Sequence, residues 1–459
     1  MSSGWPKALA GLETQLPRGE LSFDDATRQS HSGDKWFASR LPDAVVRPRT
    51  TRSVVAVLRY AHNHRIPVTA RGAGFGYVGG CVPSRGGIVL SLARMNRIRE
   101  ISSDDFVAVV QPGVITQQLQ ERVEKIGLYY PPDPASRANC SIGGNIASNA
   151  GGPRCLKYGV TRDYVLGLEV VLSDGAVVRL GGRTHKNKTG FDLTRLFVGS
   201  EGLLGIVTEA TLRLVPLPPF RACLAAGFGS MKATARAMRS VFAAGVLPSA
   251  LEVADAFTLA AARRRTGSRL LEGCRAHLIL ELDGHERSVR YELRQLERIL
   301  RTHDPLFVQR GYGTGGCEKF WQLRREFSDA LRDTGLTKLN EDIVVPRGRL
   351  EDLFKFTEWL QKKHRLPIAS FGHAGDGNIH VNVMLDAAQP EAVRRSKVAL
   401  DELFNQVLAW GGVITGEHGV GLAKKRWWPD AVSKEVRALH RAIKDALDPA
   451  GILNPGKFV

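Results

Sequence analysis

The chain has 459 residues, of which 43% are hydrophobic and 24% are charged, and it carries a formal net charge of +18 at pH 7. This length exceeds that of one typical domain, so at least two domains are expected, and the composition is that of an ordinary globular protein that needs no disulfide framework. The positive charge favours anionic partners. Because the basic residues are spread along the chain and form no nucleic-acid-binding motif, an anionic cofactor and substrate are expected instead of nucleic acid.

The six cysteines are scattered and form no C-x-x-C pair, which argues against an iron–sulfur cluster or a zinc ribbon in this chain. Reduced thiols of this kind fit a cytoplasmic location. The first residues show no basic segment followed by an apolar stretch, so no secretory signal is predicted. No apolar run approaches the roughly 20 residues of a membrane helix, so any membrane contact is expected to be peripheral, at the inner face.

The predicted elements of the first half begin with an arm, residues 1–37, which is polar, weakly patterned and expected to hold a short helix. Thr51 is the expected cap of a following helix with Val54, Val55, Leu58 and Ala61 on one side. Several strands follow, and two of them form a predicted hairpin that turns at Asp174-Gly175. The expected strands are 66–70, 88–92, 106–110, 165–172, 176–180 and 206–215.

A proline cluster, Pro216-Leu-Pro-Pro219, marks the predicted domain boundary. Beyond it, predicted strands alternate with amphipathic helices, for example 276–282 followed by 286–303. This pattern predicts an open antiparallel sheet covered by helices.

Two loops of the first half are rich in glycine. Gly74-Phe-Gly76-Tyr-Val-Gly79 is formally a G-x-G-x-x-G string, but it leads toward a strand and not into a helix, which disfavours a Rossmann site. The second loop, Ser141–Gly152, has four glycines in ten residues. Such turns let backbone N–H groups converge on an anion such as a pyrophosphate. On spacing alone, a pair of tight structural turns is an equal alternative.

Longer motifs resemble the FAD domain of the vanillyl-alcohol oxidase/p-cresol methylhydroxylase superfamily. They are Arg71-Gly-Ala-Gly, Pro131-Pro-Asp-Pro134, Gly143–Gly152 with Lys157-Tyr158-Gly159, and Phe197–Thr208. The resemblance runs from about residue 42 to the C-terminus. Its closest branch holds the glycolate oxidase catalytic subunit, D-lactate dehydrogenase and D-2-hydroxyglutarate dehydrogenase.

This resemblance implies an α+β fold: a two-subdomain FAD-binding domain of the p-cresol methylhydroxylase type plus a substrate (cap) domain with an antiparallel sheet covered by helices. The expected parts are the arm 1–37, the FAD-binding domain 38–219, the substrate domain 220–420 and a C-terminal segment 421–459 that returns to the FAD domain.

The resemblance also implies which residues bind FAD. No histidine occupies the first loop, so the bound FAD is expected to be noncovalent. Phe75, Tyr77 and Val78 depart from the family pattern and remove a hydroxyl contact. Asn454 either touches the flavin or forms a plain turn. The implied FAD-binding residues are Arg71, Gly72, Ala73, Gly74, Phe75, Gly76, Gly79, Gly80, Pro132, Ser141, Gly143, Gly144, Asn145, Ser148, Gly151, Gly152, Tyr158, Gly159, Glu201, Gly202, Ile206, Val207 and Asn454.

A candidate metal site lies in the second half. A turn over 374–378 can bring His373 and His380 together on adjoining strands, and Glu417 would complete three ligands with an open position. Zinc is the expected metal, with iron and manganese as alternatives. The alternative is that His373 and His380 are structural residues around a turn. Asp376 is expected to be a turn residue. Similarity to metal-dependent D-2-hydroxy-acid dehydrogenases favours the metal.

The resemblance assigns Arg324 to the substrate carboxylate, a task that suits a planar bidentate donor. Ser328, one helical turn further on, takes the place of a family threonine. Lys338 is a weaker candidate for a second carboxylate contact, and Asn382 is a candidate to hold the substrate.

In the expected mechanism the metal lowers the pKa of the substrate hydroxyl, and His418 removes its proton as general base. In an extended segment His418 would face the side opposite to Glu417. The α-hydrogen passes as hydride to the flavin.

The expected function is oxidation of a small D-2-hydroxy acid, of the glycolate, D-lactate or D-2-hydroxyglutarate class, to the 2-oxo acid. One alternative is a non-redox enzyme resembling alkylglycerone-phosphate synthase, against which Glu417 argues. Another is a supporting subunit of a larger oxidase complex. The electron acceptor stays open among a quinone, a cytochrome, an electron-transfer flavoprotein, an iron–sulfur subunit and oxygen.

Overall fold

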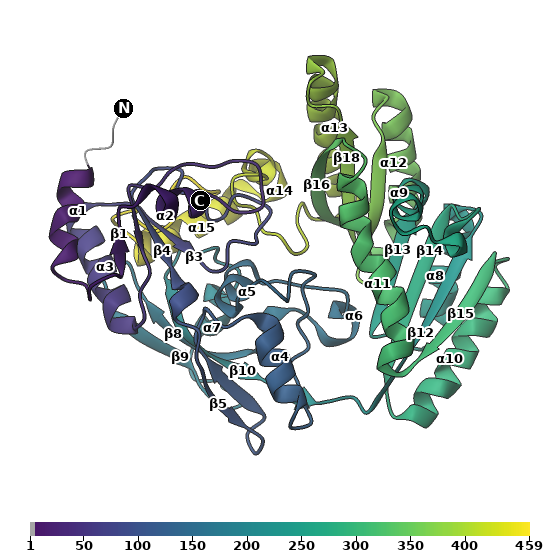
Figure 1. The fold of residues 1–459 in the computed structure, drawn as a ribbon, viewed down its shortest axis with the longest axis horizontal. Helices are drawn as coiled ribbons and strands as arrows, with labels where there is room; N and C mark the ends of the chain where they lie inside the picture. The colour runs from purple at the N-terminus through teal and green to yellow at the C-terminus, as the bar shows by residue number, and fades with distance from the viewer. Residues whose placement is uncertain (1–4) are drawn as a thin grey trace. The chain divides into compact units, whose positions relative to one another are not determined.

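The computed structural model of the protein describes residues 5–459, and the chain divides into two compact units (Figure 1). Unit 1 consists of Met1–Gly151, Val160–Leu217 and Glu417–Val459, and unit 2 of Gly152–Gly159 and Pro218–Gly416. The change of unit at Leu217 falls inside the predicted proline boundary. By contrast, the sequence did not predict that Gly152–Gly159, from the middle of a glycine-rich motif, would belong to unit 2.

The first layer of unit 1 is a four-stranded sheet of order β1-β2-β4-β3, in which β2, β4 and β3 run parallel. The arm is packed against this layer, because Leu9 and Leu12 of α1 are fully buried in the same core as Val54 and Leu58 of α3. The elements are α1 (Trp5–Glu13), β1 (Leu21–Ser22), α2 (Asp25–Ser30), β2 (Ala44–Val46), α3 (Thr51–His64), β3 (Val68–Arg71) and β4 (Ile88–Ser91).

The predicted cap of α3 is wrong by one residue. Thr50, and not Thr51, has the extended backbone of an N-cap, and its hydroxyl accepts a hydrogen bond from Ser53 N at 3.2 Å. The hydroxyl of Thr51 instead donates to Glu169 at 2.7 Å.

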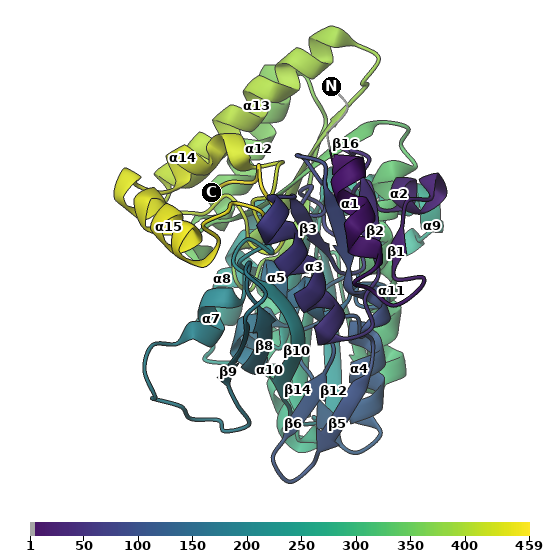
Figure 2. The same cartoon turned by 90° about the vertical axis from the view of Figure 1, so that its left-hand side faces the viewer.

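The second layer of unit 1 is a five-stranded antiparallel sheet of order β5-β6-β10-β8-β9. The predicted hairpin is confirmed, since β8 pairs with β9 and Gly175 in the turn has φ +83°. The C-terminal helices complete this unit (Figure 2). The elements are β5 (Ile98–Ser102), β6 (Val107–Val110), α4 (Thr116–Glu124), β7 (Leu128–Tyr129), α5 (Ile142–Ser148), β8 (Val165–Val171), β9 (Val177–Gly181), α7 (Leu193–Phe197), β10 (Ile206–Arg213), β11 (Val215–Pro216), α14 (Trp428–Ala431) and α15 (Lys434–Leu447).

Unit 2 is built on a seven-stranded sheet of order β15-β12-β14-β13-β17-β18-β16, and every neighbouring pair is antiparallel, as predicted. Its elements are α6 (Cys155–Tyr158), β12 (Phe220–Phe228), α8 (Met231–Ala243), β13 (Ala250–Asp255), α9 (Ala256–Thr266), β14 (Ala276–Gly284), α10 (Glu286–Arg301), β15 (Phe307–Tyr312), α11 (Gly313–Arg332), β16 (Thr337–Val344), α12 (Leu350–His364), β17 (Ile368–His373), β18 (Asn378–Leu385) and α13 (Pro390–Ala409).

Helices α9 and α11 cover one face of this sheet. Phe327 and Leu331 of α11 share a buried cluster with Ala254, Phe371 and Met384 from three strands. Because side chains alternate along a strand, Glu252, His373 and Asn382, two residues away from these positions, point to the same face. This face, called the α11 face below, holds the polar residues of the candidate site. Among residues 5–459, no helix has the length and hydropathy needed to cross a bilayer.

Candidate active site

The two glycine-rich loops lie against each other in unit 1. Ser141 is the N-cap of α5, and its hydroxyl accepts hydrogen bonds from Gly144 N at 3.4 Å and from Ala73 N at 3.2 Å. A Cβ atom on Gly72 would lie 2.5 Å from Ser141 Oγ, so only glycine allows this approach. Ser141 of the second loop is thus in contact with Gly72 and Ala73, which lead into the first loop.

The first loop is also bound by the arm and by the C-terminal segment. Lys35 N donates to Gly76 O at 2.9 Å, and a Cβ on Gly79 would lie 2.8 Å from the Trp36 ring. Asn454 is buried, has φ +45°, and donates to Gly80 O at 3.2 Å and to Glu201 O at 2.8 Å. It therefore joins two segments that the sequence assigned to FAD.

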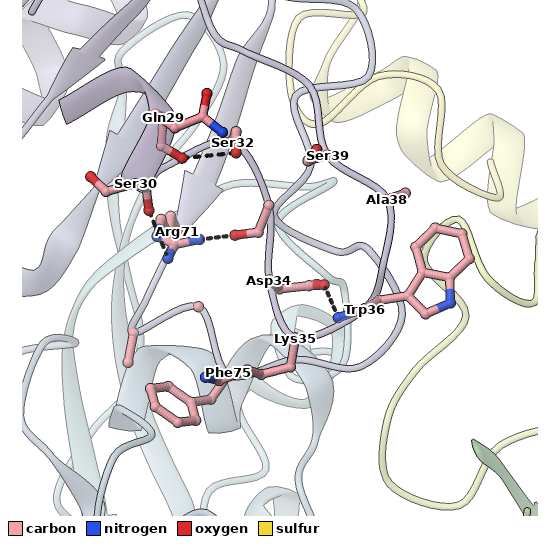
Figure 3. A pocket seen from close by; sticks show the side chains of 13 residues that line it. Gln29, Ser30, Ser32, Asp34, Lys35, Trp36, Ala38, Ser39, Arg71 and Phe75 are labelled. Atoms are coloured by element: carbon pink, nitrogen blue, oxygen red, sulfur yellow. Dashed lines mark hydrogen bonds between the residues drawn. The ribbon is translucent and has the colours of Figure 1, made fainter. Parts of the chain in front are cut away.

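Arg71 lines a cavity of about 270 Å³ between the arm and the first loop (Figure 3). Its guanidinium donates to the carbonyl oxygens of Gly33 and Ser30. Phe75 lines the same cavity, with the Lys35 ammonium 4.7 Å from the centre of its ring. These contacts give Arg71 a structural role in holding the arm to the loop.

Most of the other predicted FAD residues lie in unit 1, and three of them belong to unit 2. Asn145 donates to Thr116 Oγ1 at 2.6 Å and Ser148 to Gly144 O at 3.1 Å, so both stabilise the second loop. Gly143 is in tight contact with Pro112, and Pro132 O accepts from Gln120 at 2.9 Å. Gly202 precedes β10, and Ile206 and Val207 are the first two residues of that strand. Gly152, Tyr158 and Gly159 belong to unit 2, where the Tyr158 hydroxyl donates to Asp283 at 2.9 Å.

Glu201 fixes the segment that carries His418. Its carboxylate accepts from Val420 N at 2.7 Å and from Gly421 N at 2.8 Å. Burial raises the pKa of Glu201 above its usual value, although these hydrogen bonds act in the opposite direction. The His418 ring lies 5.3 Å from the Tyr77 ring, centre to centre. Residues 416–418 form bends and not the predicted extended segment. Glu417 and His418 therefore lack the extended backbone on which their predicted opposite orientations depended.

In unit 2, strand register brings the two predicted metal-binding histidines together. His373 is the last residue of β17, and His380 lies opposite Phe371 on the adjoining strand β18. Their ring centres are 5.5 Å apart with the planes at 84°. The turn between the strands uses Asp376 Oδ1 as an acceptor for Asn378 N at 3.3 Å, which fits the predicted turn role of Asp376.

A carboxylate that the sequence did not single out, Glu252 of β13, lies between His373 and Arg324. Its Oε1 is 2.6 Å from His373 Nδ1, and its Oε2 accepts from Arg324 Nε at 2.6 Å. Glu252 is only 1% exposed. Burial alone would raise its pKa, but the charges and hydrogen bonds of His373 and Arg324 outweigh burial and lower the pKa to about 2.

Lys338 and Ser328 form a second polar pair on the α11 face. Ser328 is on α11 with Arg324, one turn away, and its hydroxyl accepts from Lys338 Nζ at 2.8 Å. Burial lowers the pKa of Lys338 to about 8. The structure therefore places two cationic side chains, Arg324 and Lys338, on one helix face and the strand beneath it.

Three buried amide oxygens lie on the strands of the site, those of Asn340, Asn378 and Asn382, and none has a hydrogen-bond partner among the residues described. The orientation of Asn382 is fixed, because its Nδ2 donates to Ala369 O at 3.1 Å and to His380 O at 3.0 Å. Buried acceptors without donors are rare in native proteins, and a bound water, an ion or a ligand can satisfy them. These three amide oxygens could accept hydrogen bonds from a bound ligand or contact a cation.

Asp342 fixes the backbone that precedes Glu417. It is fully buried, and its carboxylate accepts from Gly416 N and Thr415 Oγ1, both at 2.9 Å, and from Asn378 Nδ2 at 2.7 Å. A Cβ on Gly416 would lie 2.5 Å from Asn378 Nδ2. Since consecutive Cα atoms are about 3.8 Å apart, this anchor limits where the backbone of Glu417 can lie.

The glycine loops and the architecture of unit 1 define an FAD-binding protein. Residues 42–181 match the family described as FAD binding domain, and residues 217–458 match the family described as FAD linked oxidases, C-terminal domain. The chain belongs to the family of FAD-linked oxidases. It is an FAD-dependent oxidoreductase, as predicted.

Similar proteins agree with this assignment. The chain is 40% identical to the glycolate oxidase subunit GlcD of Bacillus subtilis (strain 168), over 96% of this chain and 94% of that one. It is 32% identical to D-lactate dehydrogenase of Anaerostipes hadrus, over 99% and 97%. A crystal structure of p-cresol methylhydroxylase with substrate bound superposes with a TM-score of 0.81 at 18% identity, over 100% and 97%, and this likeness confirms the predicted fold class.

Proposed function

We propose that this protein oxidises a small D-2-hydroxy acid to the corresponding 2-oxo acid. The observation that carries the proposal is the α11 face, which holds two adjacent imidazoles, two cationic side chains and three buried amide oxygens without hydrogen-bond partners among the residues described. Imidazoles suit a divalent metal and cations suit a carboxylate, so this face has partners for both ends of a 2-hydroxy acid. Relatives named for glycolate and D-lactate support the same class.

We propose that His373, His380 and Glu417 hold a divalent metal ion, zinc by preference, with iron and manganese as alternatives. The residues fit such an ion, because Glu252 orients one imidazole and Asp342 fixes the backbone just before Glu417. When bound, the metal would lower the pKa of the substrate hydroxyl and so ease loss of its proton.

The remaining roles fall to side chains of this chain. Arg324 and Lys338 bind the substrate carboxylate, Ser328 orients Lys338, and the amide oxygen of Asn382 accepts a hydrogen bond from the substrate. His418 accepts the hydroxyl proton as general base, while Glu201 holds the loop around it. When bound, FAD, which we propose is held noncovalently, would supply the acceptor for the α-hydrogen as hydride.

The function is tested by mixing the FAD-loaded protein anaerobically with D- and L-2-hydroxy acids and recording the flavin absorbance. Glycolate, D-lactate and D-2-hydroxyglutarate are the first candidates. Rapid bleaching by one of these acids, with no bleaching by the L-isomer of a chiral acid, is the expected result. If no acid in the panel reduces a fully loaded flavin, the proposal is wrong.

Binding of the substrate carboxylate should weaken above about pH 8. The cationic form of Lys338 is the form that attracts an anion; it is present below its pKa of about 8 and is lost as the pH rises through that value. Titration of the flavin spectrum with oxalate over about pH 6 to 10 should show this fall in affinity. The Lys338→Met variant should bind oxalate more weakly at neutral pH and lose this dependence. An identical pH profile in the variant would exclude Lys338 from the site.

We further propose that reduced FAD passes its electrons to a separate partner: a quinone, a cytochrome, an electron-transfer flavoprotein or an iron–sulfur subunit. Two observations support this proposal. The chain has no C-x-x-C pair for a cluster of its own, and similar proteins from Bacillus subtilis and Escherichia coli are named as subunits.

A further inference from the structure

Glu252 contacts both a proposed metal ligand, His373, and the proposed carboxylate-binding residue, Arg324. One carboxylate oxygen is 2.6 Å from Nδ1 of His373, and the other accepts a hydrogen bond of 2.6 Å from Nε of Arg324. We propose that Glu252 is a positioning residue that sets His373 to bind the metal through Nε2 and sets Arg324 to bind the substrate carboxylate. This inference rests on the proposed function.

The contact with His373 determines which ring nitrogen can bind a metal. An ionised carboxylate only accepts hydrogen bonds, so Nδ1 of His373 must carry the proton. In the neutral ring the lone pair then lies on Nε2. Carboxylate–histidine–metal arrangements use the same bond to fix the tautomer and the ring orientation, and they raise the basicity of the ligand.

The contact with Arg324 leaves the guanidinium suited to a carboxylate. The bond to Glu252 uses the Nε–H, which is one of five N–H donors, so the terminal donors still present a fork to a planar anion. The guanidinium is also held over the Phe371 ring, 4.8 Å from its centre, and near the Phe327 ring, 5.6 Å from its centre. Glu252 and these two rings therefore fix the guanidinium.

The substitution Glu252→Gln separates the two roles, because an amide has one accepting end and one donating end. Arg324 can only donate, so the amide oxygen must face Arg324 and the amide NH₂ must face His373. His373 would then accept at Nδ1 and carry its proton on Nε2, the nitrogen needed by the metal. The variant should lose metal affinity and keep anion binding by Arg324, whereas a general structural defect would weaken both.

The experiment uses the full-length FAD-loaded protein. Zinc affinity is measured by competition with a chromogenic chelator, and oxalate binding to the metal-free protein is measured by calorimetry. Glu252→Gln should bind zinc about 10- to 100-fold more weakly than the parent and bind oxalate equally well. The control is Glu297→Gln, which changes a buried glutamate paired with Arg301 and Arg310 in the same unit and should change neither constant.

Failure of this inference can be distinguished from failure of the proposed metal site. If His373→Ala loses zinc and Glu252→Gln keeps it at parental affinity, the role of Glu252 is overturned and the site stands. If His373→Ala also keeps zinc, the metal site itself is wrong. If the glutamine variant does not fold, ¹⁵N NMR of histidine-labelled parent protein decides the question. A proton on Nδ1 of His373 supports the inference, and a proton on Nε2 overturns it.

Discussion

Replacing His418 with alanine is expected to slow anaerobic reduction of the flavin by the D-2-hydroxy acid by about 10²- to 10⁴-fold, the usual contribution of a positioned general base. His418 lies in a segment whose backbone is held by the Glu201 carboxylate, and its ring is near Tyr77. A neutral imidazole can accept a proton, and histidine is the side chain that most often acts as a general base.

The measurement is stopped-flow absorbance of the flavin at saturating substrate. The FAD content should be unchanged, because the proposed role of His418 is proton transfer and not cofactor binding. The matched control is His285→Ala, which removes an exposed histidine at the start of α10 in unit 2. A His418→Ala variant that reduces its flavin as fast as the parent would remove His418 from the mechanism.

Loss of the proposed metal ion should have an effect of similar size. His373→Ala and His380→Ala each remove one of two imidazoles with ring centres 5.5 Å apart, and three ligands are the usual minimum for a catalytic metal ion. We expect flavin reduction to fall by more than the 10- to 100-fold that loss of an outer hydrogen-bond partner costs. Metal content by mass spectrometry should fall in parallel.

Chelation gives an independent test of the same site. Parent protein treated with a chelator should lose flavin reduction and regain it with zinc or manganese, while both histidine variants should show no recovery. His303→Ala is the control, because His303 lies outside the sheet and contacts Ser240 Oγ at 2.9 Å. Full activity in a metal-free parent would show that deprotonation of the substrate needs no metal here.

Local patterns predicted much of the fold. The hairpin at Asp174-Gly175 was predictable, because Asp-Gly between two runs of strand-forming residues is a local signal for a tight turn. The proximity of His373 and His380 was likewise predictable, since a short turn joins their strands. The glycine loops were assigned to FAD from their motifs, and the match to known FAD-binding domains agrees.

The positions of Glu252 and Asp342 were not predictable. Each shares its strand with a second acidic residue, Asp255 in β13 and Glu341 in β16, and acidic residues within a strand usually indicate an exposed position. Their roles come from the register of β13 beside β17 and of β16 beside β18. Register between strands distant in sequence is set by the whole sheet, and no motif encodes it.

The membership of Gly152–Gly159 in unit 2 was not predicted, for a related reason. Its attachment depends on the bidentate bond of Arg154 to the buried Glu281 and on the bonds of Lys157 and Tyr158 to Asp283. These partners lie more than a hundred residues further along the chain. The sequence places the segment with its neighbours in the glycine loop, whereas ion pairs place it with the antiparallel sheet.

Neither unit is one continuous piece of chain, and this limits how the protein can acquire new substrates. Replacing 218–416 with the same stretch of a relative would keep Arg154, which lies outside that stretch, and would replace its partner Glu281. An exchange of whole segments therefore keeps this buried ion pair only where the incoming stretch supplies an equivalent carboxylate. Divergence of substrate preference in this lineage is expected to accumulate through single substitutions on the α11 face.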